Sequence, residues 1–545
     1  MSNAVHSVPT PVNEPVLGYV PASPEREQLQ AELKRQADEV VEIPLVIGGR
    51  EIRTGRTQDV VMPHEHGTVI ATCHLAGPKE IDMAVDAALD AHRDWSTMPW
   101  DRRMAIFLKA ADMLAGPWRM RMNAATMRNQ SKTCHQAEID AACELIDFFR
   151  FNAMYAERIY SEEQPPVSPP GVWNQMEFRP LEGFVYAVTP FNFTSIAVNL
   201  PAAPAMMGNV AIWKPSPSSL LSNYVGMQLL QQAGLPDGVI NFVPGDAVEI
   251  TDRLTGHPAF AGLHYTGSTA VFRKLWHRMG AQLETYRNYP RIVGETGGKD
   301  FIVAHPSAEP LAVRAALVRG AYEFQGQKCS AASRAYLPKS LWNAIRDELV
   351  GKIDDISMGD PAHFANFMGA VIHEQAFERC KGYIERAQAS PDAEVIAGGR
   401  CDGSTGWFVR PTLIHASTPD YESMREEIFG PILTVFVYED EDWAETLDLV
   451  DETSPYGLTG AVFATERAAI DQARDRLRYA AGNFYVNDKP TGAVVGQQPF
   501  GGARASGTND KAGSSLNLIR WTSPRTIKET MVPPTTYRYP FMADG

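Results

Sequence analysis

The N-terminal third of the chain repeats apolar positions at helical intervals. Residues 79–95 and 101–116 carry apolar side chains three and four positions apart, which predicts amphipathic helices within 79–160. Residues 23–40 are mostly polar and begin with Ser-Pro, which is typical of a surface helix. The run IPLVIGGREI at 43–52 predicts a short hairpin. We therefore expect a mainly helical region that follows one hairpin.

The pattern changes near residue 180, where short apolar runs begin to alternate with helical stretches. Runs rich in β-branched and aromatic residues end in or near Pro or Gly at 183–190, 209–215, 239–245 and 260–268. Helical stretches lie between them at 222–234 and 247–256. This order predicts βαβ units and a doubly wound parallel sheet, in which ligands bind beyond the carboxyl ends of the strands. A second alternating region at about 300–490 predicts a second α/β domain.

Composition narrows the class of protein. A chain of 545 residues suits two or three domains, and its net charge of −15 argues against a nucleic-acid partner because it repels phosphate. The richest apolar stretch, 200–213, is broken by Pro and Gly and is too short to cross a membrane. The first fifteen residues have neither a basic start nor an apolar core, so we expect no targeting signal and a cytoplasmic location. They predict either a disordered or a wrapped arm.

The cysteines are spaced as free thiols. None of the six forms a Cys-x-x-Cys pair, which favours reduced thiols and gives no support to a metal site. Cys329 lies in the small, polar sequence GQKCSA, unlike a core strand. A buried inert thiol is the default for a single cysteine. However, Lys328 and the backbone N–H groups that follow offer a setting that favours a thiolate.

Three further polar residues follow or end predicted strands. Glu295, in VGETGGKD, can face a cleft beside two glycines, although a solvated turn is the simpler interpretation. Asn192, in TPFNFT, can donate its amide to an oxyanion or cap a helix. Lys214 ends NVAIWK and can bind ribose or phosphate oxygens or lie on the surface. Alone, none of the three distinguishes chemistry from structure.

Taken in order, these residues form a specific series. With Asn192, Lys214, Gly267-Ser268, Glu295 before Gly-Gly-Lys, and Cys329 after Gly-Gln-x, the chain resembles the aldehyde dehydrogenase superfamily over about 45–530. The later motif REEIFGPIL agrees with it. The runs FQGQKCSAASR and GQQPFGGARASGTNDK also closely resemble one branch of that superfamily. Members of this branch oxidise L-glutamate γ-semialdehyde, formed from Δ1-pyrroline-5-carboxylate, to glutamate in the second step of proline catabolism.

The resemblance implies an α/β fold of the aldehyde dehydrogenase type. A Rossmann-type NAD-binding domain would cover 43–158 and 180–297, and an α/β catalytic domain would cover 298–512. Residues 1–42 would form an N-terminal arm. Residues 159–179 and 513–545 would form a small oligomerisation hairpin, so a homodimer or higher homo-oligomer is expected.

The resemblance also implies a mechanism. Cys329 would attack the aldehyde as a thiolate, and Asn192 with the Cys329 backbone N–H would hold the oxyanion. Glu295 would activate the water that hydrolyses the thioester. NAD would be the cofactor, and no metal is implied. The residues expected to contact NAD are Thr189, Pro190, Phe191, Lys214, Ser216, Gly267, Ser268, Glu427 and Phe429.

The sequence departs from the usual cofactor motifs. The chain contains no Gly-x-Gly, and the Gly-Ser-Thr loop continues with Ala270, Val271 and Phe272 where the family often has a second Gly. Pro217 stands where a Glu often holds the adenosine ribose. The choice between NAD and NADP therefore stays open at this point.

The small-molecule substrate would carry an aldehyde, an ammonium and a carboxylate. By resemblance, Ser330 and the backbone of Gly492 and Ala493 would bind the carboxylate, while Phe193 and Phe500 would hold the aliphatic chain. An acid must meet the ammonium. Four acids lie on the predicted helix over 135–151. Of these we predict that Glu144 binds the ammonium; the alternative is that it lies on a solvated face of the helix. A separate proline dehydrogenase would supply the pyrroline-5-carboxylate, because the arm is too short to be that domain.

Three other functions remain as alternatives. The chain could be another NAD(P)-dependent semialdehyde dehydrogenase, such as one that acts on succinate semialdehyde. It could be a thiol esterase that needs no cofactor. It could also be a non-catalytic relative, which the intact set of Asn192, Glu295 and Cys329 argues against.

Overall fold

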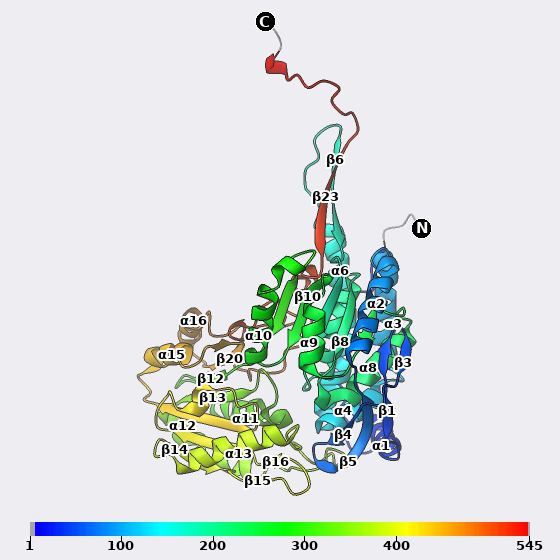
Figure 1. Ribbon diagram of the computed structural model, residues 1–545. Helices are drawn as coiled ribbons and strands as arrows, with labels where there is room; N and C mark the ends of the chain where they lie inside the picture. Colours follow the sequence, from blue (N-terminus) through cyan, green and yellow to red (C-terminus); the bar gives the residue numbers. More distant parts are fainter. Residues whose placement is uncertain (1–5, 543–545) are drawn as a thin grey trace.

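The computed structural model describes residues 6–542, and its largest elements are two seven-stranded sheets (Figure 1). The first sheet has the order β11-β10-β7-β8-β9-β2-β3, and β11 to β9 are parallel. Its strands are β2 (Leu45–Ile47), β3 (Arg50–Ile52), β7 (Phe184–Val188), β8 (Val210–Lys214), β9 (Ile240–Phe242), β10 (Phe260–Thr266) and β11 (Arg291–Glu295). The strands predicted within 183–268 are confirmed, as is the hairpin of β2 and β3.

The first sheet reverses its strand order between β7 and β10. From β7 the chain proceeds to β8 and β9 in one direction, and then returns to β10 on the other side of β7. Because such crossovers are right-handed, α7 (Thr194–Met206) and α8 (Leu220–Ala233) lie on one face of the sheet and α9 (Ala247–Thr255) on the other. An open α/β sheet binds ligands at this kind of reversal.

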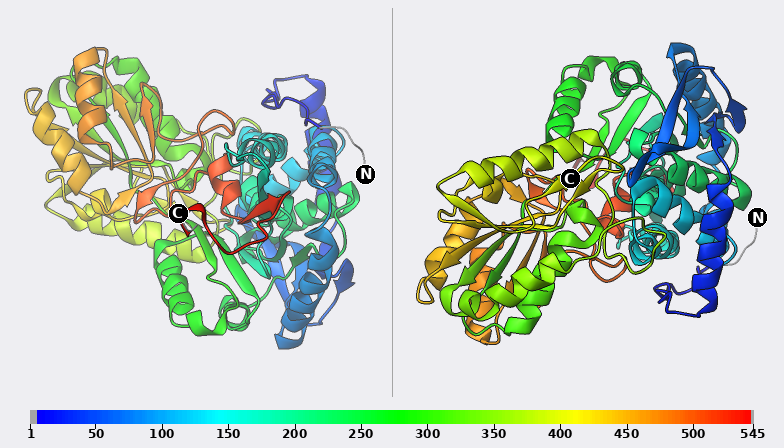
Figure 2. Two further views of the ribbon diagram at one scale, coloured as in Figure 1. Left: turned by 90° about the horizontal axis from the view of Figure 1, so that it is seen from above. Right: turned by 90° about the horizontal axis from the view of Figure 1, so that it is seen from below.

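The second sheet has the order β14-β17-β18-β13-β12-β20-β21. Its strands are β12 (Asp300–Ala304), β13 (Ala332–Pro338), β14 (Ala393–Ala397), β17 (Thr412–Ala416), β18 (Ile432–Tyr438), β20 (Thr459–Phe463) and β21 (Asn483–Val486). All neighbours are parallel except β14 and β17. The flanking helices include α11 (Pro310–Tyr322), α12 (Lys339–Asp354), α13 (Glu374–Ala389), α15 (Trp443–Glu452) and α16 (Arg467–Arg476). The two sheets confirm the predicted α/β class and form two lobes (Figure 2).

The helical region before residue 163 confirms the periodicity. It contains α1 (Pro24–Ala37), α2 (Pro78–Trp95), α3 (Trp100–Ala115), α4 (Arg119–Gln130), α5 (Cys134–Ala137) and α6 (Glu144–Glu162). The side chain of Ser23 caps α1, as the Ser-Pro start indicates. A π-helical turn at Glu138–Cys143 joins α5 to α6, so the predicted helix over 135–151 changes its winding immediately before Glu144.

Two features flank the lobes. The sequence pattern gave no strands for 57–74, yet β4 (Thr57–Met62) and β5 (Glu65–His74) pair there, and β5 also pairs with β1 (Val41–Ile43). β6 (Val172–Arg179) and β23 (Ser523–Thr530) form an antiparallel ribbon that projects from the molecule (Figure 1). The first sheet falls in the predicted ranges 43–158 and 180–297 and the second in 298–512; the boundaries themselves stay a prediction.

Candidate active site

Cys329 lies in a tight loop that leads into β13. The three residues Phe324, Gln325 and Gly326 all have positive φ, at 49°, 56° and 65°. Such strain persists only where the surroundings enforce it. The Gln325 amide does so, because it donates to the carbonyls of Ser131 and Ala370 at 3.1 and 2.7 Å. The loop thus holds the thiol in one place at the wall of a cavity.

The charge around Cys329 differs from the prediction. Burial and the nearby carboxyl groups of Asp300, Glu295 and Glu427 raise the pKa of the thiol. The expectation that Lys328 would favour the thiolate is wrong for this arrangement, because its ammonium pairs with Asp140 at 3.2 Å. In the structure as it stands, the thiol form is therefore favoured.

Asn192 follows β7 and lies beside the same loop. Its amide nitrogen donates to the carbonyl of Gln327, two residues before Cys329, at 2.9 Å. The alternative that Asn192 caps a helix is wrong, because α7 has Phe193 at its N-cap and no side-chain cap. The side-chain amide is therefore fixed near the Cys329 loop, where a donor can face an oxyanion.

Glu295 ends β11 and lines the cavity that contains Cys329. Its carboxylate accepts the backbone N–H of Gly502 at 3.3 Å, and burial raises its pKa well above the usual value. Close packing explains why Gly297 and Gly298 follow it. A Cβ on Gly297 would lie 2.1 Å from the Glu427 carboxylate, and one on Gly298 would lie 2.5 Å from the Cys329 carbonyl. The solvated-turn interpretation of Glu295 is therefore wrong.

The predicted cofactor residues lie along the carboxyl edge of the first sheet. Thr189, Pro190 and Phe191 follow β7, and Lys214 and Ser216 end and follow β8. Gly267 follows β10, and the Ser268 side chain caps α10 (Thr269–Gly280). Lys214 is buried, and burial lowers its pKa to about 8. It is therefore not the surface lysine that the sequence left open.

The second lobe contributes Glu427 and Phe429 to this edge. Glu427 accepts the backbone N–H of Gly298 at 3.1 Å, and burial raises its pKa to about 7. Phe429 has a φ of 58° and packs edge-to-face against Phe191, with ring centroids 5.8 Å apart. Ser268 and Glu427 both line a cavity of about 560 Å³. A helix N-terminus and a buried cation at a strand end suit the phosphate and hydroxyl groups of a dinucleotide, so these residues fit NAD.

At both departures from the family pattern, the residues belong to a helical turn. Ala270, Val271 and Phe272 continue α10, and the Phe272 ring occupies the position that a Cβ on Gly294 would need. Pro217 begins a short 3-10 helix, Pro217–Ser219, capped by Ser216.

One cavity of about 380 Å³ brings most of the predicted catalytic and substrate residues together. Its walls include Glu144, Phe193, Glu295, Cys329, Ser330, Gly492, Ala493 and Phe500. The Ser330 hydroxyl donates to the Thr491 hydroxyl at 2.9 Å, which ties the nucleophile loop to the segment around Gly492. A positive φ of 95° at Gly492 explains the glycine there. Phe193 and Phe500, which the resemblance assigns to the aliphatic chain, both lie in the cavity wall.

Among the four acids of the predicted helix, Glu144 has the setting of a ligand group. Glu138 pairs with Arg119, Asp140 pairs with Lys132 at 2.7 Å, and Asp147 accepts two bonds from the N-terminal arm. Glu144 accepts a hydrogen bond from Ser195 and faces the cavity. Burial and the neighbouring charge of Asp140 raise its pKa to about 8.

Sequence reasoning missed a charged cluster beside this cavity and one part of its wall. Lys132 and Lys328 share the carboxylate of Asp140 and lie over the ring of Phe193, at 4.5 and 5.8 Å from its centroid. Asn13, Glu14 and Val16 of the arm also line the cavity. No local motif marks either feature, because each depends on segments far apart in the chain.

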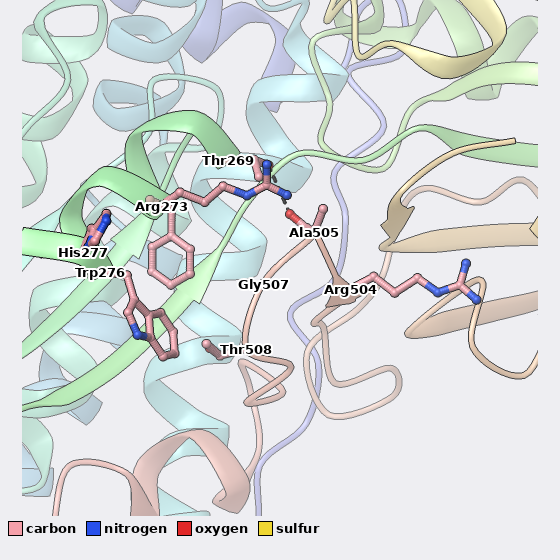
Figure 3. A pocket seen from close by; sticks show the side chains of 9 residues that line it. Thr269, Arg273, Trp276, His277, Arg504, Ala505, Gly507 and Thr508 are labelled. Carbon is pink, nitrogen blue, oxygen red and sulfur yellow. Dashed lines mark hydrogen bonds between the residues drawn. The ribbon is translucent and has the colours of Figure 1, made fainter. Parts of the chain in front are cut away.

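A second cavity, of about 520 Å³, lies between α10 and residues 504–508 (Figure 3). Thr269 donates to the carbonyl of Ala505 across it at 3.1 Å, and Arg273, Trp276 and Arg504 line it. Among the described residues of its lining there is no thiol or carboxylate. This second cavity therefore contains none of the predicted catalytic residues.

Comparisons with known proteins agree on one family. The model of the aldehyde dehydrogenase family matches residues 51–527. The delta-1-pyrroline-5-carboxylate dehydrogenase, mitochondrial, of Dictyostelium discoideum is 52% identical over 540 residues, which cover 99% of this chain and 97% of that protein. The crystal structure of the delta-pyrroline-5-carboxylate dehydrogenase from Mycobacterium tuberculosis bound with NAD has a TM-score of 0.96 and 54% identity, with 100% of each chain covered.

Proposed function

This chain belongs to the aldehyde dehydrogenase family, and on that premise we propose that it oxidises L-glutamate γ-semialdehyde to L-glutamate with NAD. One observation carries the proposal. A single cavity joins the Cys329 thiol to an acid, Glu144, and to the Ser330 and Gly492-Ala493 groups. An aldehyde with an ammonium and a carboxylate needs these three kinds of partner. The similarity to two pyrroline-5-carboxylate dehydrogenases over nearly the whole chain supports the same substrate.

In the proposed mechanism, the Cys329 thiolate attacks the carbonyl carbon of the aldehyde. The raised pKa of the free thiol means that it must lose its proton before or during this attack. The Asn192 amide and the Cys329 backbone N–H hold the oxyanion that forms. Bound NAD supplies the hydride acceptor. Glu295 then takes a proton from the water that cleaves the Cys329 thioester, a task that suits a carboxyl group whose pKa is raised.

Substrate recognition in this proposal depends on charge. Burial raises the pKa of Glu144 to about 8, and an adjacent ammonium lowers that pKa, so binding ionises the carboxylate. Ser330 and the backbone N–H groups of Gly492 and Ala493 bind the substrate carboxylate. Phe193 and Phe500 cover the short aliphatic chain between the two charged ends.

For NAD, we propose the contacts predicted along the sheet edge. The N-terminus of α10 at Ser268 suits the pyrophosphate, and Lys214 suits ribose hydroxyls. Glu427 and Phe429 suit the nicotinamide ribose and ring. Thr189, Pro190, Phe191, Ser216 and Gly267 form the rest of this surface.

The test is the rate of NADH formation with pyrroline-5-carboxylate and NAD. NADP replaces NAD in a second series, and succinate semialdehyde and propanal replace the substrate in a third. We expect strong turnover with pyrroline-5-carboxylate and NAD. Turnover of succinate semialdehyde with no turnover of pyrroline-5-carboxylate would reject the substrate and favour another semialdehyde dehydrogenase.

We further propose that the protein is a homodimer. The ribbon of β6 and β23 projects from the body, and the tail beyond it exposes apolar side chains such as Val532 and Phe541, which are 80% and 83% accessible. Apolar groups this exposed are typical of an interface. Light scattering that gives a monomer mass at micromolar concentration would reject the dimer.

A cytoplasmic location and a separate supplier of substrate complete the proposal. All six cysteines are free thiols, which suits a reducing compartment. Across residues 6–542 no helix is both long and apolar enough to cross a membrane. The printed name of the Dictyostelium relative places that protein in mitochondria. We also propose that a separate proline dehydrogenase supplies the pyrroline-5-carboxylate. Cell fractionation with an antibody to the protein tests the location.

A further inference from the structure

The N-terminal arm, here residues 6–22, is fixed to the body although it contains no helix or strand. The backbone N–H of Val8 donates to Glu157 at 2.8 Å, and that of Leu17 donates to Glu138 at 2.9 Å. Tyr19 is 3% accessible, and its hydroxyl donates to Glu138 at 2.7 Å. The arm is therefore wrapped, which decides the choice that the sequence left open. The arm leads into α1, which lies at the lower end of the first lobe in Figure 1.

The middle of the arm reaches the cavity that contains Cys329, here called the substrate cavity. The Asn13 amide nitrogen donates to the Asp147 carboxylate and to the Val495 carbonyl, both at 2.8 Å. Its amide oxygen accepts from the Gln497 side chain at 2.9 Å. One side chain thus clamps the segment after Gly492 and Ala493 to helix α6. Asp147 is 3% accessible, so these bonds lie in a largely dry setting.

The carboxylate of Glu14 in the arm forms ion pairs within the protein. Glu14 pairs with Arg119 at 2.5 Å and with Arg150 at 2.7 Å. Its backbone N–H donates to Asp147 at 2.8 Å. The Glu14 carboxylate is thus committed to two guanidinium groups. What the arm offers the cavity is part of its wall, made with Asn13 and the half-exposed Val16, and a fixed position for the neighbouring loop.

We propose that Asn13 is a positioning residue for substrate binding, and that Asn13 and Val16 form a wall that limits substrate length. The inference rests on the proposed function, because the loop that Asn13 clamps includes Gly492 and Ala493, which we assign to the substrate carboxylate. A loop that is held in place before binding loses less conformational freedom when the substrate binds. The clamp therefore acts on affinity for the amino-acid aldehyde, while the chemistry at Cys329 proceeds as before.

The first experiment compares Asn13→Ala and Asn13→Asp with the full-length wild type. Asn13→Asp keeps the shape but removes the N–H donors and places a second carboxylate beside Asp147. Both variants are expected to raise KM for glutamate semialdehyde roughly tenfold, the effect of losing hydrogen bonds to a buried carboxylate. We expect kcat to be unchanged and kcat/KM for propanal to be unchanged. Val12→Ala is the matched control, because Val12 is 72% accessible and adjacent in the arm.

The second experiment measures substrate length with Val16→Ala. Two substrates are compared: glutamate semialdehyde and the semialdehyde that is longer by one methylene. The kcat/KM of the longer one, divided by that of glutamate semialdehyde, is expected to rise about fourfold in the variant, because burying one methylene contributes about that much. The ratio of hexanal to propanal should rise as well. An unchanged KM in both Asn13 variants, or an equal loss for glutamate semialdehyde and propanal, overturns the clamp. Unchanged length ratios overturn the wall. If the wild type turns over propanal but not glutamate semialdehyde, the proposed function fails, and the hexanal ratio still tests the wall.

Discussion

The carboxyl edge of the first sheet, where we propose that NAD binds and which we call the cofactor edge, is built differently from the substrate cavity. The cofactor edge takes most of its residues from the ends of neighbouring strands in one sheet, such as Lys214 at the end of β8 and Ser268 after β10. The substrate cavity takes its residues from the arm, from α6, from the loop before β13 and from the segment around Gly492. Most of the edge follows from the strand order of one sheet, whereas the cavity exists only after distant segments have packed together.

This difference implies that the two regions can be perturbed separately. A change at the edge should alter the use of NAD, and a change in the cavity should alter the use of the aldehyde. Cys329 lies where both meet, so its loss should remove all turnover. Single substitutions in each region can test that separation.

Cys329→Ala should lower dehydrogenase activity on the order of 10⁴-fold or more, because the proposed thioester forms on the Cys329 sulfur. The measurement is NADH formation with saturating substrate and NAD. Cys401→Ala is the control, since Cys401 is also a half-buried thiol but lies in β15 (Cys401–Asp402), away from the cavity. Substantial activity in Cys329→Ala would remove the nucleophile from the account.

Asn192→Ala should lower kcat by about 10²–10³, the usual effect of losing one oxyanion donor. The comparison is with Asn192→Asp, which keeps the size but replaces the donor amide with a carboxylate. Both should lower kcat for glutamate semialdehyde and for propanal alike, since both form the same oxyanion. A loss below about threefold would show that Asn192 only supports the Gln327 carbonyl.

Glu144→Gln should raise KM for glutamate semialdehyde by roughly 10- to 100-fold, because it removes a charged hydrogen bond to the ammonium. Steady-state kinetics with propanal provide the control, and its KM should not change. Equal effects on the two aldehydes would assign Glu144 to the packing around Ser195 instead.

Lys214→Met should raise KM for NAD by about tenfold and leave KM for the aldehyde unchanged, since one charge-assisted hydrogen bond is lost. Met keeps the length and the buried apolar stem of lysine. A parallel rise in the aldehyde KM would break the separation between edge and cavity.

Glu427→Gln should raise the rate at which iodoacetamide alkylates Cys329 at pH 8, by a few-fold. The Glu427 carboxylate raises the pKa of the thiol, so its neutralisation lowers that pKa and increases the thiolate fraction. Alkylation of the wild type should become faster as the pH rises. Peptide mapping measures the Cys329 rate separately from the other thiols. A slower reaction in Glu427→Gln would contradict the assigned sign.

Much of the fold could be predicted because its signals are local. Apolar runs that end in Pro or Gly marked the strands around Thr189 and Lys214, and the Ser-Pro start marked α1. Strands β4 and β5 escaped, because their residues are largely polar and only partly buried. The π-helical turn before Glu144 also escaped, since nothing in the residues distinguishes it from an α-helix.

The candidate site shows the same limit. The order of Asn192, Glu295 and Cys329 indicated the family, but the environment of the thiol did not follow from its neighbours. Lys328 is adjacent in sequence and would favour a thiolate, yet it pairs with Asp140 from the π-helical turn. Asn13 is separated from Val495 by 482 positions, so no local pattern could place it at the cavity.

The most direct test of the account is a single-turnover experiment with Glu295→Gln. The variant is mixed with pyrroline-5-carboxylate and NAD, NADH is followed on the millisecond scale, and the quenched protein is digested and mapped by mass. The account predicts a burst of about one NADH per subunit without further turnover, and a glutamyl adduct on the peptide that contains Cys329. Continued turnover at the wild-type rate, or an adduct on any other residue, would contradict the central claim that Cys329 forms the thioester and Glu295 resolves it.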